Sequence, residues 1–192
     1  QRAARGRPSA PTRIVEEILP IDVVLLENWR LMDLGFSVRQ PMSALQWLAQ
    51  RRLIKNSVYC ENCNTHFGLN SYQDAVDRYR WKCKGCNKRQ SVRDGSFFSE
   101  SRLSLQTLIC YIYGWSRNMQ QSEIQHEAGM NDAPNTLADW ANFCRDVCEV
   151  DLETNPSVIG GINADGTPIV VEIDESKFFH RKYHRGQWRP GH

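Results

Sequence analysis

The sequence predicts an α+β protein built from several small modules, and three patterns indicate this fold class. Two Cys-x-x-Cys pairs are separated by nineteen residues, as in a small four-cysteine ribbon. Hydrophobic residues before and after this ribbon recur at the spacing of amphipathic helices. Near the end of the chain, two runs rich in β-branched residues flank a turn sequence, which predicts strands. We therefore expect N-terminal helices, the ribbon, a second helical block and the first strands of a sheet domain.

The composition favours a globular intracellular protein. The chain has 192 residues, of which 41% are hydrophobic, and this is enough to form real cores. No apolar run approaches the roughly 18 residues of a membrane span, and the N-terminus lacks the apolar stretch of a signal peptide. Seven cysteines, four of them in two Cys-x-x-Cys pairs, favour a metal site over a disulfide framework. We expect neither secretion nor a membrane partner.

Residues 1–13 form a basic arm that we expect to be disordered, because it has almost nothing apolar to bury. The arm contains four arginines and no acidic residue. Arg5 and Arg7 stand in an Arg-Gly-Arg-Pro sequence that matches the core of an AT-hook, a segment that lies in a narrow A·T minor groove of DNA. A solvated basic tail is the alternative interpretation of the same residues.

Residues 14–56 are predicted to form two or three short helices, because their apolar positions recur at helical spacing in two stretches. Pro20 and Pro41 are acceptable at helix starts. The segment Leu34–Ser37 contains a glycine, and we expect it to separate the helices.

Residues 57–96 are predicted to form a zinc ribbon. Its ligands would be Cys60, Cys63, Cys83 and Cys86, since each pair can place two sulfurs about 2.3 Å from one tetrahedral ion. Four thiolates fill the coordination shell and leave no position for water, so the zinc would be structural rather than catalytic. A redox-active cysteine pair is the alternative, but neither motif has the βαβ setting that such chemistry favours.

The second half of the ribbon and its exit carry a cluster of cations typical of a surface that follows a phosphate backbone. These predicted DNA-binding residues are Arg78, Arg80, Lys82, Lys84, Lys88, Arg89 and Arg93. A four-thiolate zinc site is itself doubly negative, so compensation of that charge is the alternative explanation of the cluster.

Residues 97–156 are predicted to form three helices: one over 103–115, one over 121–128 that ends at Gly129, and a third from Pro134 or the next residue. Three helices with a glycine turn before the third resemble a helix-turn-helix unit. The acidic character of the block weakens that interpretation, and packing on another domain or forming a homodimer are alternative roles. Candidate base-reading side chains are Asn131, Asn135, Thr136 and Asn142.

Residues 157–192 begin with a predicted hairpin whose second strand is nearly continuous in apolar residues and is therefore expected to be buried on both faces. Glu172, Asp174 and Glu175 lie on or beside this strand, where carboxylates need a cation or another partner. A solvated edge strand is the alternative. Two strands alone are marginal, so we expect a fragment cut soon after a larger sheet domain begins. The basic residues that follow are predicted DNA contacts: Lys177, Arg181, Lys182 and Arg185.

The order of these segments resembles that of Merlin-type transposases and of the related bacterial insertion-sequence transposases of the ISXO kind. The resemblance runs from about Tyr59 to the end of the chain. Its most specific parts are the ribbon placed ahead of the Ser91–Phe98 segment, which reads SVRDGSFF, and the Val171–Phe178 strand, which reads VEIDESKF.

The resemblance implies an RNase H-like catalytic domain that starts near residue 157 and that cleaves and transfers DNA strands with two Mg²⁺ or Mn²⁺ ions. Asp174 matches the first aspartate of the family's acidic triad and would supply part of that metal site. The other two acidic residues of the family would lie beyond His192. We therefore expect this chain alone to be inactive in catalysis.

Two functions are consistent with these patterns. The first is the DNA-binding portion of a cut-and-paste transposase, which would bind double-stranded DNA at the terminal inverted repeats of a transposon. The second is a domesticated, transposase-derived zinc-ribbon factor that binds DNA or protein without catalysis. Either function implies a nuclear location in a eukaryotic host and a cytoplasmic one otherwise.

Overall fold

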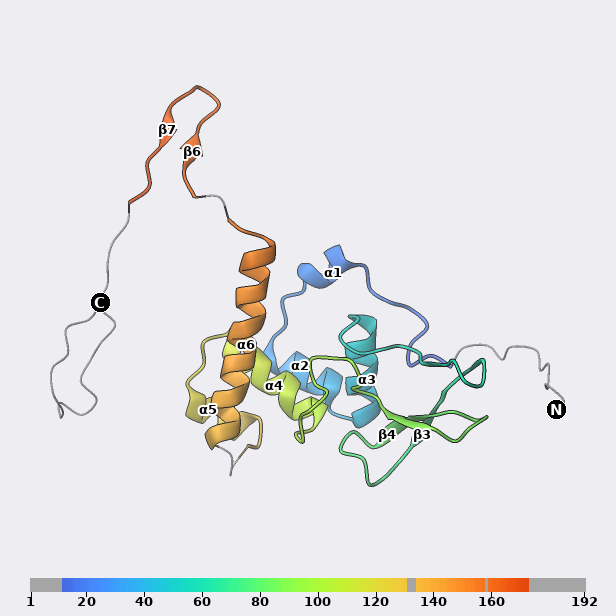
Figure 1. The fold of residues 1–192 in the computed structure, drawn as a ribbon. Coiled ribbons are helices and arrows are strands. Elements are labelled where there is room, and N and C mark those ends of the chain that lie inside the picture. The colour runs from blue at the N-terminus through green and yellow to red at the C-terminus, as the bar shows by residue number, and fades with distance from the viewer. Residues whose placement is uncertain (1–11, 131–133, 158, 173–192) are drawn as a thin grey trace, which may run out of the picture. The chain divides into compact units, whose positions relative to one another are not determined.

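A computed structural model describes residues 12–130, 134–157 and 159–172 of the chain (Figure 1). These residues form both helices and strands, so the predicted α+β class is confirmed. The chain divides into two compact units, Gln1–Cys144 and Arg145–His192. Among the described residues, no helix combines the length and the hydropathy that crossing a bilayer requires.

Three short helices open the described part of the chain: α1 (Ile21–Leu25), α2 (Leu31–Val38) and α3 (Pro41–Gln50). Pro20 is the N-cap of α1 and Pro41 is the first residue of α3. Proline is favourable at a helix start because its missing N–H would have no helical partner there. Both prolines thus lie at helix starts, as predicted.

The predicted break at Leu34–Ser37 is wrong, because α2 continues through Gly35. Leu34 and Val38 lie one helical turn apart and are both buried, so a continuous helix is what brings both into the core. The break lies at Gln40 instead, whose backbone is extended (φ −106°, ψ 146°). An extended conformation is favoured for the residue ahead of a proline.

Five short strands form the ribbon in two antiparallel sheets, and all of them fall within the predicted range 57–96. In the first sheet, β1 (Tyr59–Cys60) pairs with β2 (Thr65–His66). The second sheet contains β3 (Gly68–Ser71), β4 (Tyr79–Lys82) and β5 (Arg89–Ser91), with β4 in the middle.

Three further helices match the three that were predicted: α4 (Leu105–Ser116), α5 (Gln121–Glu127) and α6 (Pro134–Thr154). The side chain of Ser104 caps α4 by accepting a hydrogen bond from the backbone N–H of Thr107. Gly129 follows α5 at φ +67°, a conformation that glycine adopts without strain at a helix end.

One hydrophobic core joins the N-terminal helices, the ribbon and the helical block. Helix α2 packs on α3, and both pack on α4 (Figure 1). Trp81 of β4 and Phe67, which precedes β3, are buried in the same cluster as Leu48 of α3 and Leu108 of α4. The inner side of the ribbon is therefore part of the core of the first unit.

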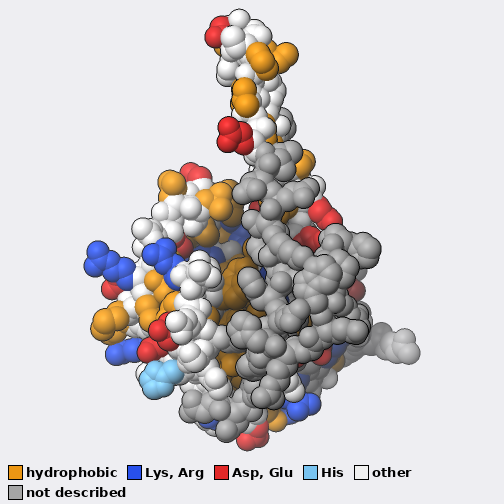
Figure 2. Space-filling view, turned by 90° about the vertical axis from the view of Figure 1, so that its left-hand side faces the viewer, with side chains coloured by type: hydrophobic (Ala, Val, Ile, Leu, Met, Phe, Trp, Pro, Cys, Tyr) orange, Lys and Arg blue, Asp and Glu red, His pale blue; other side chains and the backbone are white. Residues whose placement is uncertain are grey.

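The second unit contains the end of α6 and a hairpin of β6 (Gly161–Ile162) and β7 (Pro168–Ile169), joined at the predicted turn 163–166. The predicted burial of the second strand is wrong, because Val170 is 82% exposed and Val171 is 43% exposed. Hydrophobic side chains of the hairpin are visible at the surface at the top of Figure 2. A pair of short strands has no second layer of its own to cover such side chains.

Candidate metal centre and basic sheet face

Two tight turns, or knuckles, present the four cysteines of the ribbon. The first knuckle joins β1 to β2, and in it the N–H of Cys63 donates to the carbonyl of Cys60 at 3.3 Å. The second joins β4 to β5, and in it the N–H of Asn87 donates to the carbonyl of Cys83 at 3.1 Å. Each pair of cysteines is thus held at the end of a hydrogen-bonded strand pair.

Both knuckles end in an asparagine with a left-handed backbone. Asn64 follows the first cysteine pair at φ 48°, and Asn87 follows the second at φ 58°. Asparagine tolerates this conformation better than most residues because its short polar side chain bonds locally. The repeated Cys-x-x-Cys-Asn pattern is readable in the sequence and indicates the left-handed residue after each pair, which the spacing of the cysteines alone does not.

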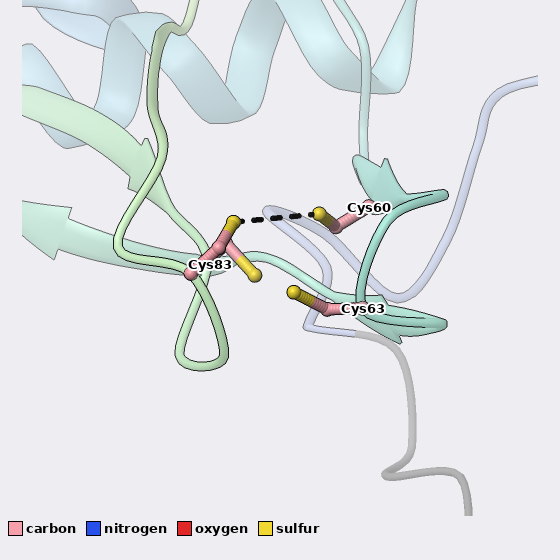
Figure 3. A group of neighbouring side chains, drawn as sticks. Cys60, Cys63 and Cys83 are labelled. Atoms are coloured by element: carbon pink, nitrogen blue, oxygen red, sulfur yellow. Dashed lines mark hydrogen bonds between the residues drawn. The ribbon is translucent and has the colours of Figure 1, made fainter. Parts of the chain in front are cut away.

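The four sulfurs lie within 4.8 Å of one another, and those of Cys60 and Cys86 are 3.8 Å apart. Figure 3 shows the side chains of Cys60, Cys63 and Cys83 converging from opposite loops. A tetrahedral zinc ion with Zn–S bonds of about 2.3 Å requires sulfurs about 3.8 Å apart. The four predicted ligands are therefore placed together by the fold and fit a metal ion such as zinc.

Gly85 in the second knuckle has no room for a side chain. A Cβ atom at this position would lie 2.8 Å from the sulfur of Cys63 and 3.0 Å from its Cβ. The backbone of Gly85 does not have a positive φ, so space rather than conformation requires glycine there. The two knuckles are therefore in close contact where Gly85 faces the side chain of Cys63.

The thiols of the cluster differ in acidity. The backbone N–H groups of Cys86 and Gly85 lower the pKa of Cys83 to about 7. Hydrogen bonding to Cys86, together with burial, raises the pKa of Cys63 to about 12. Burial is also the main cause that raises the pKa of Cys60. Four thiolates cannot share this space without a cation, and a divalent metal supplies that charge.

The cations of the second sheet lie on one face. Residues paired across neighbouring strands share a face, and residues two apart on a strand do so as well. Lys82 is paired with Arg89, and Arg80 is two residues before Lys82, so all three lie on the side opposite the buried Trp81. Asn70, which is paired with Arg80, also lies there. This solvent face of β3–β5 holds three cations and no carboxylate on its strands.

Tyr72, just after β3, lies next to two of these cations. The guanidinium carbon of Arg80 lies 4.5 Å from the centre of the Tyr72 ring, and that of Arg89 lies 5.5 Å from it. Such contacts hold guanidinium groups in place while leaving their N–H groups able to donate. The tyrosine therefore orders two of the three strand cations.

Arg93 corrects the sequence-based prediction, because its side chain is only 3% exposed and is not a surface cation. Its Nε and Nη2 atoms each lie 2.5 Å from a carboxylate oxygen of Asp77. The same guanidinium donates to the carbonyls of Ser101 and Leu103 at 3.0 and 2.6 Å. A buried charge needs such complete pairing, so Arg93 joins the ribbon to the start of the helical block.

The remaining predicted cations of the ribbon, Arg78, Lys84 and Lys88, are exposed. Arg78 lies in a turn at φ 61°, and its guanidinium donates to the carbonyl of Gln73. Several predicted site residues lie outside the described residues, namely Arg5, Arg7, Asn131, Asp174, Glu175, Lys177, Arg181, Lys182 and Arg185.

The chain is similar to one curated protein, male abnormal protein mab-31 of Caenorhabditis elegans. The two are 25% identical over 149 residues, which cover 71% of this chain and 34% of the relative. The chain thus spans about a third of the length of the protein it matches. No model of a protein family matches the chain. No solved structure matches it either.

Proposed function

We propose that this chain binds double-stranded DNA through the solvent face of β3–β5, on a ribbon shaped by one structural zinc ion. The observation that carries the proposal is the placement of Arg80, Lys82 and Arg89 on one face of a three-stranded sheet. The opposite face is closed by the buried Trp81, so the basic face is the one that a partner can reach.

The geometry favours phosphate contact over compensation of the thiolate charge for the three strand cations. Lys84 and Lys88 lie in or beside the second knuckle, where a cation is well placed to offset the charge of the metal site. Arg80, Lys82 and Arg89 lie on the strands, two of them ordered by Tyr72. Cations spaced along strands can contact successive phosphates, and each contact adds to the affinity for any duplex.

The transposase resemblance makes this proposal more specific. On that interpretation α4–α6 form a helix-turn-helix-like block, residues from 157 onward begin an RNase H-like domain, and Asp174 belongs to its Mg²⁺ or Mn²⁺ site. The ribbon and the block would then recognise terminal inverted repeats, with or without a homodimer. The observed succession of ribbon, three helices and hairpin is consistent with that layout.

A non-catalytic zinc-ribbon factor that binds DNA or protein is the second candidate function. The four-cysteine cluster supports this candidate, because four thiolates around one metal ion leave no coordination position for a reacting water.

A salt titration of DNA binding tests the proposed interface. Changing Arg80, Lys82 and Arg89 together to glutamine should reduce the slope of log K against log salt by about 2 to 3, because each lost phosphate contact removes about 0.9. The matched control changes Arg30, Arg39 and Arg117 to glutamine, which removes the same charge from exposed positions elsewhere.

Equal slopes in the two triple variants would exclude the sheet face as the DNA interface. A second arm compares inverted-repeat DNA of an element of the resembled family with a scrambled duplex of the same length. Preference for the repeats supports transposon-end recognition, whereas equal binding leaves a sequence-independent contact to phosphate.

A further inference from the structure

A surface pocket of about 540 Å³ lies between the Ser96–Leu103 segment and the first half of α6. Its lining includes three aromatic residues, Phe97, Trp140 and Phe143. Trp140 is 5% exposed, whereas the two phenylalanines are each 46% exposed. The pocket therefore combines a buried indole with two half-exposed phenylalanine rings.

Each phenylalanine ring stands nearly at right angles to the indole of Trp140. The centre of the Phe97 ring lies 5.4 Å from that of Trp140 at an interplanar angle of 82°. The centre of the Phe143 ring lies 5.6 Å from Trp140 at 87°. Phe97 and Phe143 thus each pack edge to face on the indole, and their exposed parts leave aromatic surface open to the pocket, which a rounded cation can contact.

The pocket is also negatively charged. Glu100 and Asp139 line it, against the single cation Arg102. Within the part of the chain that the structure describes, neither carboxylate takes part in an ion pair. Two carboxylates beside aromatic rings favour a cationic ligand over a neutral or anionic one.

Both segments that form the pocket, α6 and Ser96–Leu103, are held in place before any ligand binds. On α6, Asp139 and Phe143 are four residues apart and so lie on the same side of the helix. In the Ser96–Leu103 segment, the hydroxyls of Ser96 and Ser99 both donate to the carbonyl of Arg93, at 2.6 and 3.0 Å. The buried guanidinium of Arg93 fixes the carbonyl of Ser101 in the same segment. A preformed site loses little conformational entropy when it binds.

We propose that this pocket binds the trimethylated side chain of a lysine in a partner polypeptide. The methyl groups would contact the rings, and Glu100 and Asp139 would complement the positive charge. An unmodified ammonium is strongly hydrated and would gain less, because the lining offers mainly aromatic carbon. The pocket opens at the surface, so a side chain can enter it from outside.

Titration of the full zinc-loaded chain with four probes tests this proposal, with the indole N–H resonance of Trp140 as the readout. The probes are a short alanine–serine peptide with one trimethyllysine, the same peptide with unmodified lysine, the same peptide with an uncharged tert-butyl analogue, and phosphocholine. We expect the trimethyllysine peptide to bind about 3-fold to 30-fold more tightly than the tert-butyl peptide, since only the charge differs. We expect phosphocholine to bind more weakly than the trimethyllysine peptide.

Two variants connect the binding to the pocket. Phe143→Leu removes a half-exposed ring but keeps an apolar side chain, and Asp139→Asn removes one exposed carboxylate. Each should weaken trimethyllysine binding, whereas Phe36→Leu, at an exposed aromatic residue of α2, should not. Equal binding of the charged and uncharged peptides, or unchanged binding by both pocket variants, would overturn the proposal. Tighter binding of phosphocholine would replace the polypeptide partner with a choline headgroup.

Discussion

The solvent face of β3–β5 and the pocket beside α6 are two surfaces of one hydrophobic core, and they differ in charge and in construction. The sheet face presents Arg80, Lys82 and Arg89 at positions set by strand register. The pocket presents carboxylates and rings from two segments about forty residues apart. The sheet face can be predicted from the alternation of side chains along paired strands. The pocket forms only when segments distant in sequence meet in the tertiary fold.

The ion pair of Arg93 with Asp77 lies between these two surfaces. Asp77 belongs to the loop between β3 and β4, and Arg93 follows β5. Their partners include the backbone of Ser101 and the N–H of Leu105, which is the first residue of α4. The buried ion pair therefore contacts segments next to both surfaces, and variants can measure its contribution to stability.

Loss of a metal ligand should have the largest effect. Cys83→Ala should reduce bound zinc from one ion to none and unfold the ribbon, because zinc binding contributes about 10 to 16 kcal/mol in small zinc-dependent folds. Metal analysis and the amide resonances of β1–β5 measure the two effects. Helices α2–α4 contact one another directly and should keep their far-ultraviolet signal, but with a lower free energy of unfolding, because their core loses Trp81 and Phe67 of the ribbon.

Cys110→Ala is the control, because Cys110 lies on α4 outside the four-cysteine cluster. It should retain one zinc ion. Full zinc content in Cys83→Ala would contradict the metal site. Loss of the helices together with the ribbon would show that the pocket also depends on zinc.

Removing the partner of Arg93 should have the next largest effect. Asp77→Ala leaves a buried guanidinium without its carboxylate and should lower the free energy of unfolding by about 3 to 5 kcal/mol, measured in urea. Adding Arg93→Met should recover much of that loss, because the buried charge is then absent.

Asp74→Ala provides the comparison on the same loop, because Asp74 is exposed and its loss should change stability by no more than about 0.5 kcal/mol. Similar stabilities of the Asp77 and Asp74 variants would show that the buried ion pair does not stabilise the fold.

A smaller effect is expected where the knuckles touch. Gly85→Ala would place a Cβ atom 2.8 Å from the Cys63 sulfur and should weaken zinc binding about tenfold, equivalent to about 1.4 kcal/mol. Competition with a chromogenic chelator measures this affinity. Gly35→Ala is the control, because no atom lies within 4 Å of its added Cβ and α2 should become about 0.5 to 1 kcal/mol more stable. Unchanged zinc affinity in Gly85→Ala would refute the close contact.

The smallest effect concerns a single cation. Lys84→Gln should lower the salt slope of DNA binding by about 0.9 if this lysine contacts a phosphate, and should leave it unchanged if the lysine only offsets the metal-site charge. Lys55→Gln, at an exposed lysine ahead of the ribbon, should leave the slope unchanged. The result decides whether the basic face extends from the strands into the knuckle.

Local patterns predicted much of the structure. The cysteine spacing identified the four residues that the fold brings together, because each pair needs only a short turn. The helices at 105–116 and 134–154 followed from apolar spacing, and the hairpin turn followed from its Asn and Gly residues. Local patterns were wrong at Gly35, which suggested a break although its neighbours in the core require a continuous helix, and at the apolar run of the second hairpin strand, which is exposed.

Tertiary features did not follow from the sequence. Arg93 looks like another surface cation because its carboxylate partner lies sixteen residues earlier and nothing local connects the two. The pocket was missed for the same reason, since Phe97 and Trp140 meet only after the chain has folded. The predictions of a helix-turn-helix, an RNase H-like domain and DNA contacts rest on resemblance and charge, and the experiments above test the DNA contacts.

The shared core limits how this ribbon could evolve. Trp81 and Phe67 are buried together with residues of α3 and α4, so the ribbon cut out alone would expose both rings to water. A self-contained zinc module can be shuffled between genes as a cassette. This ribbon would have to move together with the helices that cover it, and its inheritance should follow that of the helices rather than that of the cysteines alone.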